Sequence, residues 1–463
     1  MLAQNILEEL KKIVGKENVL TSKEDMIAYS FDATAAMPEV KPDVVVMPEN
    51  KEQIVEIVKL AGQHKIPIIT RGAGTNLSGG TIPIKNGIVL SMLKLDKIIE
   101  IDAENLTARV QPGLIIQKLN DAVAPYGLMY PPDPGTVTTA TMGGSVSECS
   151  GGLRGLKYGV TKDYIMGLEV VMADGSVIRT GGKTVKNVSG YDLTKLFTGA
   201  EGTLGIITEI TVKLIPAPKY RRSMLAIFDD IDKAGNTIAD IISNKVIPAT
   251  LEIMDNVTIR TVENYAKIGL PVEAEAILIL EVDGNIEQIV INEYETVQKI
   301  CKDNGAVEIK LAQSDKERDA VFAARRAALP ALAQVRPTTV LEDATVPRSK
   351  IPQMLKALKE IAKKYNLQIG TFGHAGDGNL HPTILTDESD KEEMERVEKA
   401  VDEIFKIAIE LGGTLSGEHG IGMAKAKYME WEFGKEGVEV MKKIKDALDP
   451  DHILNPGKMF GGN

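Results

Sequence analysis

The stretch RGAGTNLSGG, residues 71–80, places four glycines among threonine, asparagine and serine side chains. It follows an apolar run at residues 66–70 that is typical of a buried strand. Glycine permits positive φ and close approach of the backbone, so successive N–H groups in such a loop can bind phosphate oxygens. The stretch lacks the G-x-G-x-x-G spacing that opens a helix in dinucleotide-binding folds, because Pro83, Gly87 and then an apolar strand follow. Taken alone, it fits a mobile surface loop equally well.

The residues around this stretch predict a small strand–helix–strand unit and a second cluster of loops. Residues 43–47 and 66–70 are expected as strands, and residues 50–64 have helical spacing of apolar side chains. A run rich in glycine, threonine and serine covers residues 131–159, and we expect it to be loop backbone throughout. A β-hairpin is expected at residues 164–179.

The composition changes after Pro218, where glycine becomes rarer and predicted helices alternate with strands. We expect an α+β domain with an antiparallel sheet. The expected helices are residues 232–243, 286–304, 313–333, 350–365 and 387–411, and the expected strands are residues 249–254, 276–282 and 306–311.

The sequence HAGDGNLH, residues 374–381, predicts a tight hairpin between strands at residues 369–372 and 383–385. In that hairpin His374 lies directly opposite His381, with their Cβ atoms about 5 Å apart.

Three of the five histidines lie either in this hairpin or in GEHG, residues 417–420. With Glu418 as a carboxylate, His374 and His381 form the two-histidine, one-carboxylate ligand set that binds Zn²⁺, Fe²⁺ or Mn²⁺ and leaves positions open for substrate. The alternative is that both histidines only form hydrogen bonds within a tight turn.

The totals exclude several classes of protein. With 463 residues, 43% of them hydrophobic and 26% charged, the chain is expected to be a soluble enzyme of two or three domains. A net charge of −11 argues against nucleic acid and anionic membrane surfaces as partners. Cys149 and Cys301 are too few for an iron–sulfur cluster and are typical of a reducing cytoplasm. No apolar run approaches the roughly 20 residues of a transmembrane helix.

Five motifs taken together resemble the FAD-dependent 2-hydroxyacid dehydrogenases: RGAGTNLSGG, the PPDPGT…GG…GG run, GAEGTLGI, HAGDGNLHP and GEHGIG. The resemblance covers almost the whole chain in order. It implies an N-terminal helical arm (residues 1–39), a vanillyl-alcohol-oxidase-type FAD domain (40–218), an α+β substrate domain (219–415) and a C-terminal segment that returns toward the flavin (416–463).

The resemblance also assigns residues to the FAD, which it predicts to be non-covalent because the first glycine-rich loop holds no histidine. The residues implied for the pyrophosphate are Arg71, Gly72, Ala73, Gly74, Thr75, Asn76 and Ser78. Those implied for the ring and adenosine portions are Pro132, Gly135, Thr136, Gly143, Ser145, Gly152 and Ile207, with Asn455 nearby.

For catalysis, the resemblance implies His419 as the base and Arg325, with Arg326 as a competitor, as the partner of the substrate carboxylate. Leu329 and Leu341 stand where members acting on a second carboxylate have polar residues. The implied reaction is metal-assisted oxidation of a small D-2-hydroxy acid, D-lactate or glycolate, to the 2-oxo acid, with hydride transfer to flavin N5.

Two alternatives remain open: a metallohydrolase using the His/His/Glu set, and a non-catalytic flavin subunit that relays electrons. Without an iron–sulfur or dinucleotide motif, the chain is expected to pass electrons to a partner and not to NAD. An electron-transferring flavoprotein is the expected partner, and an iron–sulfur subunit is the alternative.

Overall fold

Unit 1 of the computed structural model, which describes residues 2–461, is assembled from three separated segments. Its segments are Met1–Ser150, Val160–Ala217 and Glu418–Asn463, while unit 2 comprises Gly151–Gly159 and Pro218–Gly417. The two units border each other in sequence at Ala217 and Pro218, where the composition changes.

A four-stranded sheet in unit 1 carries the strand that leads into residues 71–80. Its strands, in the spatial order β1-β2-β4-β3, are β1 (Val19–Leu20), β2 (Val44–Val46), β4 (Ile88–Ser91) and β3 (Ile68–Arg71). Both β2 and β3 run parallel to β4, and helix α3 (Lys51–His64) connects β2 to β3. The predicted strand–helix–strand unit is therefore confirmed. The Asn50 side chain caps α3 by accepting a hydrogen bond from the Gln53 N–H.

Helix α1 (Gln4–Val14) buries Ile6, Leu10 and Val14 in the same core as α3. Helix α2 (Lys23–Ala28) follows it and starts at Ser22, whose side chain accepts from the Asp25 N–H.

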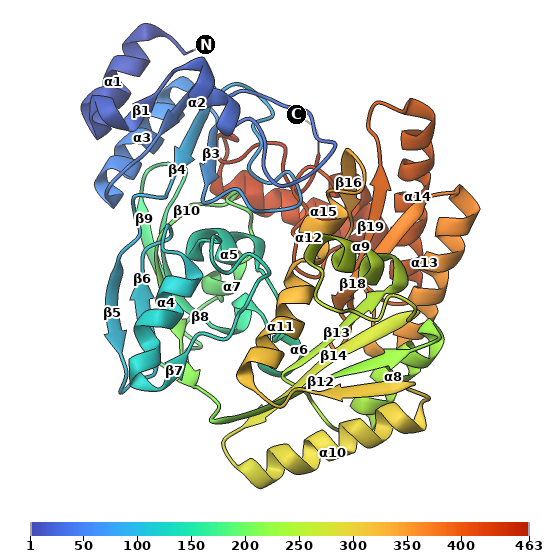
Figure 1. Ribbon diagram of the computed structural model, residues 1–463. Helices are drawn as coiled ribbons and strands as arrows, with labels where there is room; N and C mark the ends of the chain where they lie inside the picture. Colours follow the sequence, from blue (N-terminus) through green and yellow to red (C-terminus); the bar gives the residue numbers. More distant parts are fainter. Residues whose placement is uncertain (1, 462–463) are drawn as a thin grey trace. The chain divides into compact units, whose positions relative to one another are not determined.

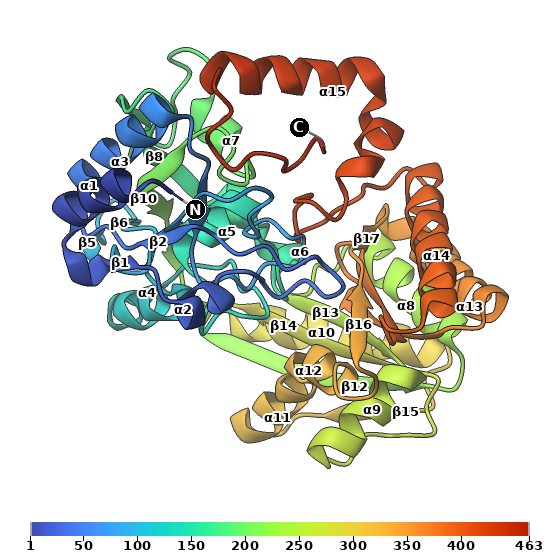
Figure 2. The same ribbon diagram turned by 90° about the horizontal axis from the view of Figure 1, so that it is seen from above.

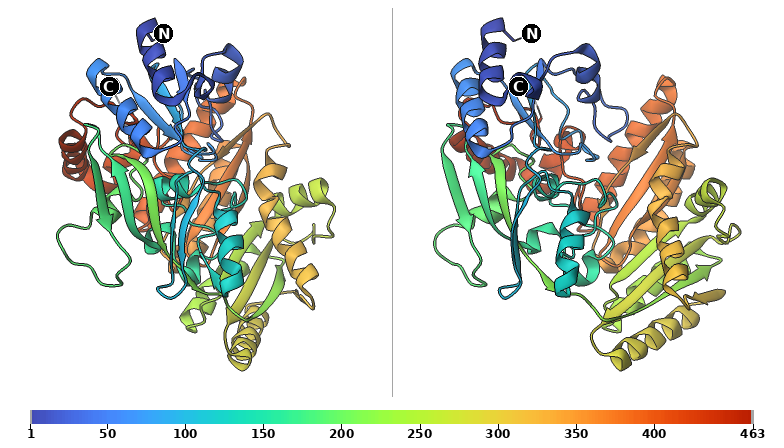
Figure 3. Two further views of the ribbon diagram at one scale, coloured as in Figure 1. Left: turned by 90° about the vertical axis from the view of Figure 1, so that its left-hand side faces the viewer. Right: turned by 60° about the vertical axis from the view of Figure 1, so that its left-hand side comes forward.

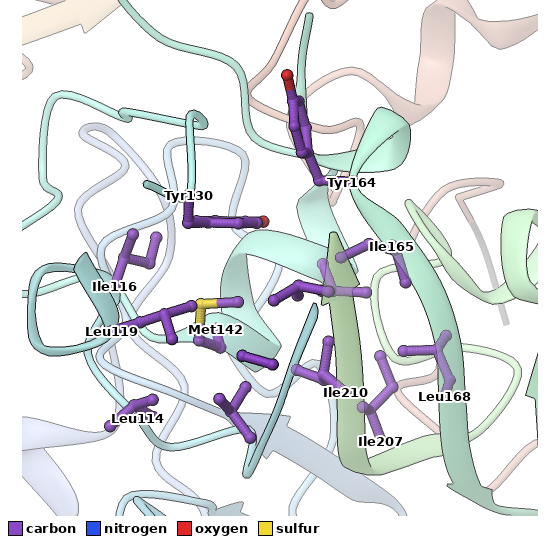
Figure 4. Packing of buried hydrophobic residues seen from close by; sticks show 14 of the residues in the cluster. Leu114, Ile116, Leu119, Tyr130, Met142, Tyr164, Ile165, Leu168, Ile207 and Ile210 are labelled. Atoms are coloured by element: carbon purple, nitrogen blue, oxygen red, sulfur yellow. The ribbon is translucent and has the colours of Figure 1, made fainter. Parts of the chain in front are cut away.

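The second sheet of unit 1 is antiparallel and forms the largest apolar core of the unit (Figure 4). Its strands, in spatial order, are β5 (Ile98–Asp102), β6 (Thr107–Val110), β10 (Ile206–Lys213), β8 (Ile165–Val171) and β9 (Val177–Gly181). The pairing of β8 with β9 confirms the predicted hairpin. Helix α4 (Ile116–Val123) packs into this core, whereas β7 (Leu128–Met129) pairs with β11 (Ile215–Pro216) in a separate two-stranded sheet.

The run at residues 131–159 is not loop backbone throughout, so that prediction was wrong. Helices α5 (Met142–Glu148) and α6 (Gly155–Tyr158) lie within it. The Thr141 hydroxyl accepts from the Gly144 N–H and starts α5. Gly143 lies within this helix because the helix packs closely on Pro112. A Cβ at position 143 would lie 2.6 Å from the Pro112 side chain.

The C-terminal segment of unit 1 completes the sheet that carries β3. Leu454 forms a parallel bridge with Ile68, and the Asn455 N–H donates to the Ile68 carbonyl at 2.8 Å. Within this segment, Leu454 is preceded by helix α15 (Met429–Leu448), which is kinked at Gly434. Helix α7 (Leu193–Phe197) belongs to an earlier segment of unit 1. Buried Lys445 of α15 donates to the carbonyls of Thr203 and Leu454 and pairs with Asp449. These contacts anchor the segment on both sides.

Unit 2 is an α+β layer structure around one antiparallel sheet (Figure 1). The spatial order of the strands is β15 (Glu308–Leu311), β12 (Tyr220–Phe228), β14 (Ala276–Gly284), β13 (Thr250–Asp255), β18 (Gln368–His374), β19 (Asn379–Thr386) and β16 (Thr338–Leu341), with β17 (Ala344–Thr345) also pairing with β19. The expected antiparallel sheet is confirmed.

Helices cover both faces of this sheet (Figure 2). One face bears α9 (Asn256–Ala266), α11 (Asp315–Arg326) and α12 (Ala328–Leu332). The other bears α8 (Ile231–Ser243), α10 (Glu287–Asp303), α13 (Ile351–Tyr365) and α14 (Lys391–Glu410), the last two lying side by side (Figure 3).

Two of the predicted helices differ from the structure. The expected helix at residues 313–333 is two helices, because Pro330 has no N–H to donate to the carbonyl four residues earlier. The helix expected from residue 387 begins at Lys391, where the Asp390 side chain caps it by accepting from the Glu393 N–H.

Among the helices of residues 2–461, none combines the length and the apolar character needed to cross a bilayer.

Candidate active site

The histidine hairpin, which we define as residues 368–386, joins β18 to β19 through a turn of four residues. The turn is held from several sides. The Gly376 N–H donates to the Leu251 carbonyl of β13 at 2.9 Å. Gly378 has φ of +93°, and a Cβ there would lie 2.0 Å from the Val346 carbonyl oxygen. Only glycine fits that position without moving the backbone.

The predicted register of this hairpin was wrong, although the two histidines still lie on one face of the sheet. His374 pairs with Asn379, and His381 lies opposite Phe372. The register therefore differs from the expected one by two positions, and a shift of two leaves every side chain on the same face of the sheet. Both histidines project from one face as diagonal neighbours.

The two imidazoles lie close enough to share one ion. Their ring centroids are 5.2 Å apart, and a ring nitrogen of each lies within 4.8 Å of one on the other. Both side chains are buried, and the His381 ring also packs against Phe372 at 5.4 Å. Two buried imidazoles at this spacing fit a transition-metal or zinc site.

Glu252 of β13, which the sequence analysis missed, connects His374 to Arg325. One carboxylate oxygen lies 2.8 Å from His374 Nδ1, and the other accepts from Arg325 Nε at 2.6 Å. The Arg325 guanidinium also lies 4.6 Å above the Phe372 ring. Burial alone would raise the pKa of Glu252, but the charges and hydrogen bonds of His374 and Arg325 lower it overall.

A second carboxylate, Asp343, lies near His381 but beyond hydrogen-bond distance. Its Oδ1 atom lies 3.7 Å from His381 Nδ1 and accepts from Asn379 Nδ2 at 2.6 Å. Its Oδ2 atom accepts from the Ser416 hydroxyl at 2.6 Å. Asp343 therefore ties the chain just before GEHG to the histidine hairpin.

Gly417 packs directly against this group within unit 2. A Cβ at Gly417 would lie 2.4 Å from Thr345 Oγ1 and 2.6 Å from Asn379 Nδ2. Glu418 and His419 follow immediately and are the first residues of the C-terminal segment of unit 1.

The segment after His419 is fixed within unit 1 by Glu201, a further residue that the sequence analysis missed. Its carboxylate accepts from the N–H groups of Ile421 and Gly422, each at 2.7 Å. Burial raises the pKa of Glu201, and these two N–H groups partly offset the rise. GAEGTLGI was recognised as a motif, but nothing in it indicated a distant backbone partner.

The glycine loop, which we define as residues 71–80, turns its polar side chains toward the protein. Arg71 Nη1 donates to the Phe31 carbonyl at 2.8 Å, and Asn76 Nδ2 donates to Asp32 at 2.8 Å. Gly74 has φ of +69°, and a Cβ there would lie 2.2 Å from Arg71 Nη2. A Cβ at Gly72 would lie 2.3 Å from Thr141 Oγ1. Side chains that are engaged by the protein and a backbone without Cβ atoms at Gly72 and Gly74 are compatible with phosphate binding by backbone N–H groups.

Other predicted FAD residues lie around this loop or in the second glycine-rich run. Ser78 is buried, and its hydroxyl makes no hydrogen bond to any described residue. Asn455 Nδ2 donates to the carbonyls of Gly80 and Glu201. A glycine cradle with an enclosed polar atom fits the pyrophosphate of FAD.

The remaining predicted FAD residues divide by exposure. Gly135 and Thr136 are exposed, and Ala73 and Thr75 are half-buried. The buried ones are Pro132, Gly143, Ser145, Gly152 and Ile207. Gly152 falls in unit 2, and the others lie in unit 1.

The described residues thus combine a parallel β–α–β frame that carries a glycine loop with paired histidines on a separate antiparallel sheet. The crystal structure of p-cresol methylhydroxylase has this fold, with a TM-score of 0.81 at 21% identity over 99% of this chain and 98% of that one. Residues 42–181 match the model of an FAD binding domain, and residues 217–459 match that of the FAD linked oxidases, C-terminal domain. The chain belongs to the FAD-linked oxidase family.

Curated relatives agree along the whole chain. Glycolate oxidase subunit GlcD of Bacillus subtilis is 53% identical over 99% of this chain and 97% of that protein. The Escherichia coli K12 subunit of the same name is 40% identical over 98% and 90%. D-lactate dehydrogenase of Archaeoglobus fulgidus is 37% identical over 98% of each. The protein is therefore an FAD-linked oxidoreductase, and the metallohydrolase alternative was wrong.

Proposed function

We propose that this protein oxidises a small D-2-hydroxy acid, D-lactate or glycolate, to the corresponding 2-oxo acid. Bound FAD supplies the acceptor for the two electrons released. The relatives named glycolate oxidase subunit and D-lactate dehydrogenase support this substrate class. The observation that carries the proposal is the pair of buried imidazoles on the histidine hairpin, with Arg325 joined to one of them through Glu252.

We propose that residues 40–218 and 416–463 hold the FAD and that residues 219–415 hold the substrate. The glycine loop supports the first assignment, because it is rich in glycine and its Arg71 and Asn76 side chains are engaged by the protein. Arg71 and Asn76 support the cofactor indirectly in this proposal, by shaping the loop from outside.

His374, His381 and Glu418 are the proposed ligands of a divalent ion, Zn²⁺, Fe²⁺ or Mn²⁺. Such an ion acts as a Lewis acid that lowers the pKa of a coordinated hydroxyl. The packing of Gly417 against Asn379 supports Glu418 as the third ligand, because Glu418 is the next residue in the chain.

His419 is the proposed base that accepts the hydroxyl proton of the substrate. In this proposal His419 takes the proton, whereas its neighbour Glu418 binds the metal ion. Glu201 supports this role by fixing the backbone two and three residues later.

Arg325 is the proposed partner of the substrate carboxylate. It is buried on the histidine-bearing face of the sheet, whereas Arg326 is exposed. Leu329 and Leu341 pack against the same apolar cluster as Phe372 and offer no partner for a second carboxylate. This supports a small monocarboxylate as substrate.

The electrons are proposed to pass to a protein partner, an electron-transferring flavoprotein or an iron–sulfur subunit. The word subunit in the names of two relatives supports a partner chain. Cys149 and Cys301 are too few to bind a cluster, and burial raises the pKa of Cys301 to about 12. The low cysteine content also supports a cytoplasmic location for this protein.

Dye reduction by the purified, FAD-loaded chain tests this function. We expect turnover with D-lactate or glycolate, much less with L-lactate and D-2-hydroxyglutarate, and none with NAD as acceptor. Flavin that is reduced by none of the 2-hydroxy acids in a single turnover would refute the proposal and favour an electron-relay subunit. Appreciable NAD reduction would refute the proposed partner.

A further inference from the structure

Glu252 is a fully buried carboxylate in the interior of the unit 2 sheet, on the same face as the two histidines. We propose that Glu252 is a positioning residue that sets the His374 tautomer and the Arg325 orientation with one carboxylate. The proposal rests on the proposed function only in taking His374 as a metal ligand and Arg325 as the substrate contact.

The tautomer follows from the geometry of the hydrogen bond. Glu252 Oε1 is 2.8 Å from His374 Nδ1, and an ionised carboxylate can only accept. The proton of the neutral imidazole therefore lies on Nδ1, and the lone pair of Nε2 is available to a metal ion. Carboxylates commonly orient metal-binding histidines in this way.

The other oxygen restrains Arg325. Its Nε donates to Glu252 Oε2 at 2.6 Å while its guanidinium stacks on the Phe372 ring at 4.6 Å. The hydrogen bond and the ring contact together fix the plane of the Arg325 guanidinium group, which would bind the substrate carboxylate. The positive charge of Arg325 also balances the buried negative charge, which would otherwise be costly.

The linkage between the two restraints distinguishes Glu252 from an ordinary buried ion pair. A glutamine at position 252 presents one oxygen and one NH₂ group. It can accept from either His374 Nδ1 or Arg325 Nε, but its NH₂ group then faces a donor at the other position. Glu252→Gln should therefore disturb the metal ligand or the arginine although its shape is preserved.

Glu281 provides a matched control on the neighbouring strand. It pairs in register with Thr250, is buried, and accepts from the Ser223 hydroxyl at 2.9 Å. Glu281→Gln makes the same chemical change in the same sheet without touching the proposed site.

Co²⁺ titration of the metal-stripped, FAD-loaded full chain, followed by visible absorption, measures the effect without turnover. We expect Co²⁺ affinity to fall about 10–100-fold in Glu252→Gln, as for other residues that orient metal ligands, and to change less than twofold in Glu281→Gln. His374→Ala should abolish binding. If His374→Ala abolishes binding while Glu252→Gln binds as the wild type does, the positioning role is refuted and the metal site stands. If His374→Ala binds Co²⁺ normally, the proposed ligand set itself is wrong.

A measurement on the unmodified residue covers the case in which Glu252→Gln does not fold. Two-bond ¹H–¹⁵N spectra of histidine-labelled protein report which ring nitrogen carries the proton, and the chain has only five histidines to resolve. With the resonance assigned through His374→Gln, we expect His374 to carry its proton on Nδ1 in the metal-free protein. A proton on Nε2 would overturn the proposal whatever the substrate of the enzyme.

Discussion

The histidine hairpin and the glycine loop each have a glycine-rich turn at the end of a strand. They differ in the groups proposed to bind a ligand, which are side chains in the hairpin and backbone N–H groups in the loop. In the hairpin, the proposed chemistry belongs to side chains: the His374 imidazole is hydrogen-bonded to Glu252, and Asp343 lies 3.7 Å from His381. In the glycine loop, Arg71 and Asn76 are engaged by the protein, and the backbone is what remains. A proposed functional position in the hairpin therefore depends on the imidazole nitrogens that its side chain carries. One in the loop depends on glycine, because no Cβ fits there.

Removing a ligand from the hairpin is the strongest way to test this contrast. His374→Ala should release the metal and lower kcat roughly 10⁴-fold, because a Lewis-acid ion contributes several kcal/mol at the transition state. FAD should remain bound, since the glycine loop belongs to unit 1. Metal analysis, flavin absorbance and dye reduction measure the three quantities. His64→Ala, at an exposed position of α3, is the control. Full metal content in His374→Ala would remove this residue from the ligand set.

His419→Ala separates proton transfer from binding. We expect kcat to fall about 10²–10⁴-fold, the usual contribution of general-base catalysis, with flavin and metal content unchanged. The fall in kcat at low pH, where the base is protonated, should disappear from the pH–rate profile of the variant. Turnover at the wild-type rate would exclude His419 from the mechanism.

Within β13, Asp255 provides a contrast with Glu252. Its burial raises the pKa of Asp255 to about 6 despite the hydrogen bonds from Thr258 and Thr371. Because the folded pKa exceeds the unfolded value, Asp255 contributes stability below about pH 4 that is lost as pH rises through about 6. The change is about 3 kcal/mol.

Urea unfolding between pH 4 and 7 measures how the free energy of unfolding changes with pH. Asp255→Asn should flatten this slope because asparagine does not ionise. An equal slope in the two proteins would show that other groups carry it.

Adding one methyl group to the glycine loop should have the smallest effect of the four changes. Gly72→Ala places a Cβ 2.3 Å from Thr141 Oγ1, so the loop or the cap of α5 must move, at about 1–3 kcal/mol. We expect weaker FAD binding, measured by flavin fluorescence, with Co²⁺ affinity unchanged. Gly62→Ala, in helix α3 with no contact closer than 3.8 Å, is the control. Lost Co²⁺ affinity in Gly72→Ala would contradict the separation of the two regions.

The sequence predicted that the two histidines share a face, because the alternation of side chains along a strand depends on parity alone. His374 and His381 share a face in both the predicted and the observed register. Glu252 and Asp343 were missed because their contacts depend on which strands become neighbours. Glu252 and His374 are 122 residues apart, and no local pattern encodes the pairing of β13 with β18.

The glycine loop could be recognised from its composition, but the partners of its side chains could not be predicted. The partners of Arg71 and Asn76 lie about forty residues earlier, at Phe31 and Asp32, in a segment without a distinctive motif. Helix α5 was missed because its glycines outweighed the cap signal at Thr141.

The three-part construction of unit 1 has a consequence for the order in which the protein is made. During synthesis, Gly151–Gly159 and Pro218–Gly417 leave the ribosome before any residue of Glu418–Asn463. Every segment of unit 2 is therefore available while unit 1 is still incomplete. The missing contacts are the bridge of Leu454 to Ile68, the hydrogen bond from Asn455 to the Gly80 carbonyl and the N–H groups that Glu201 accepts from. Domains generally fold as units when their residues are available. The nascent chain would then complete unit 2 first, and unit 1, which carries the glycine loop, would be the last part of the fold to be completed.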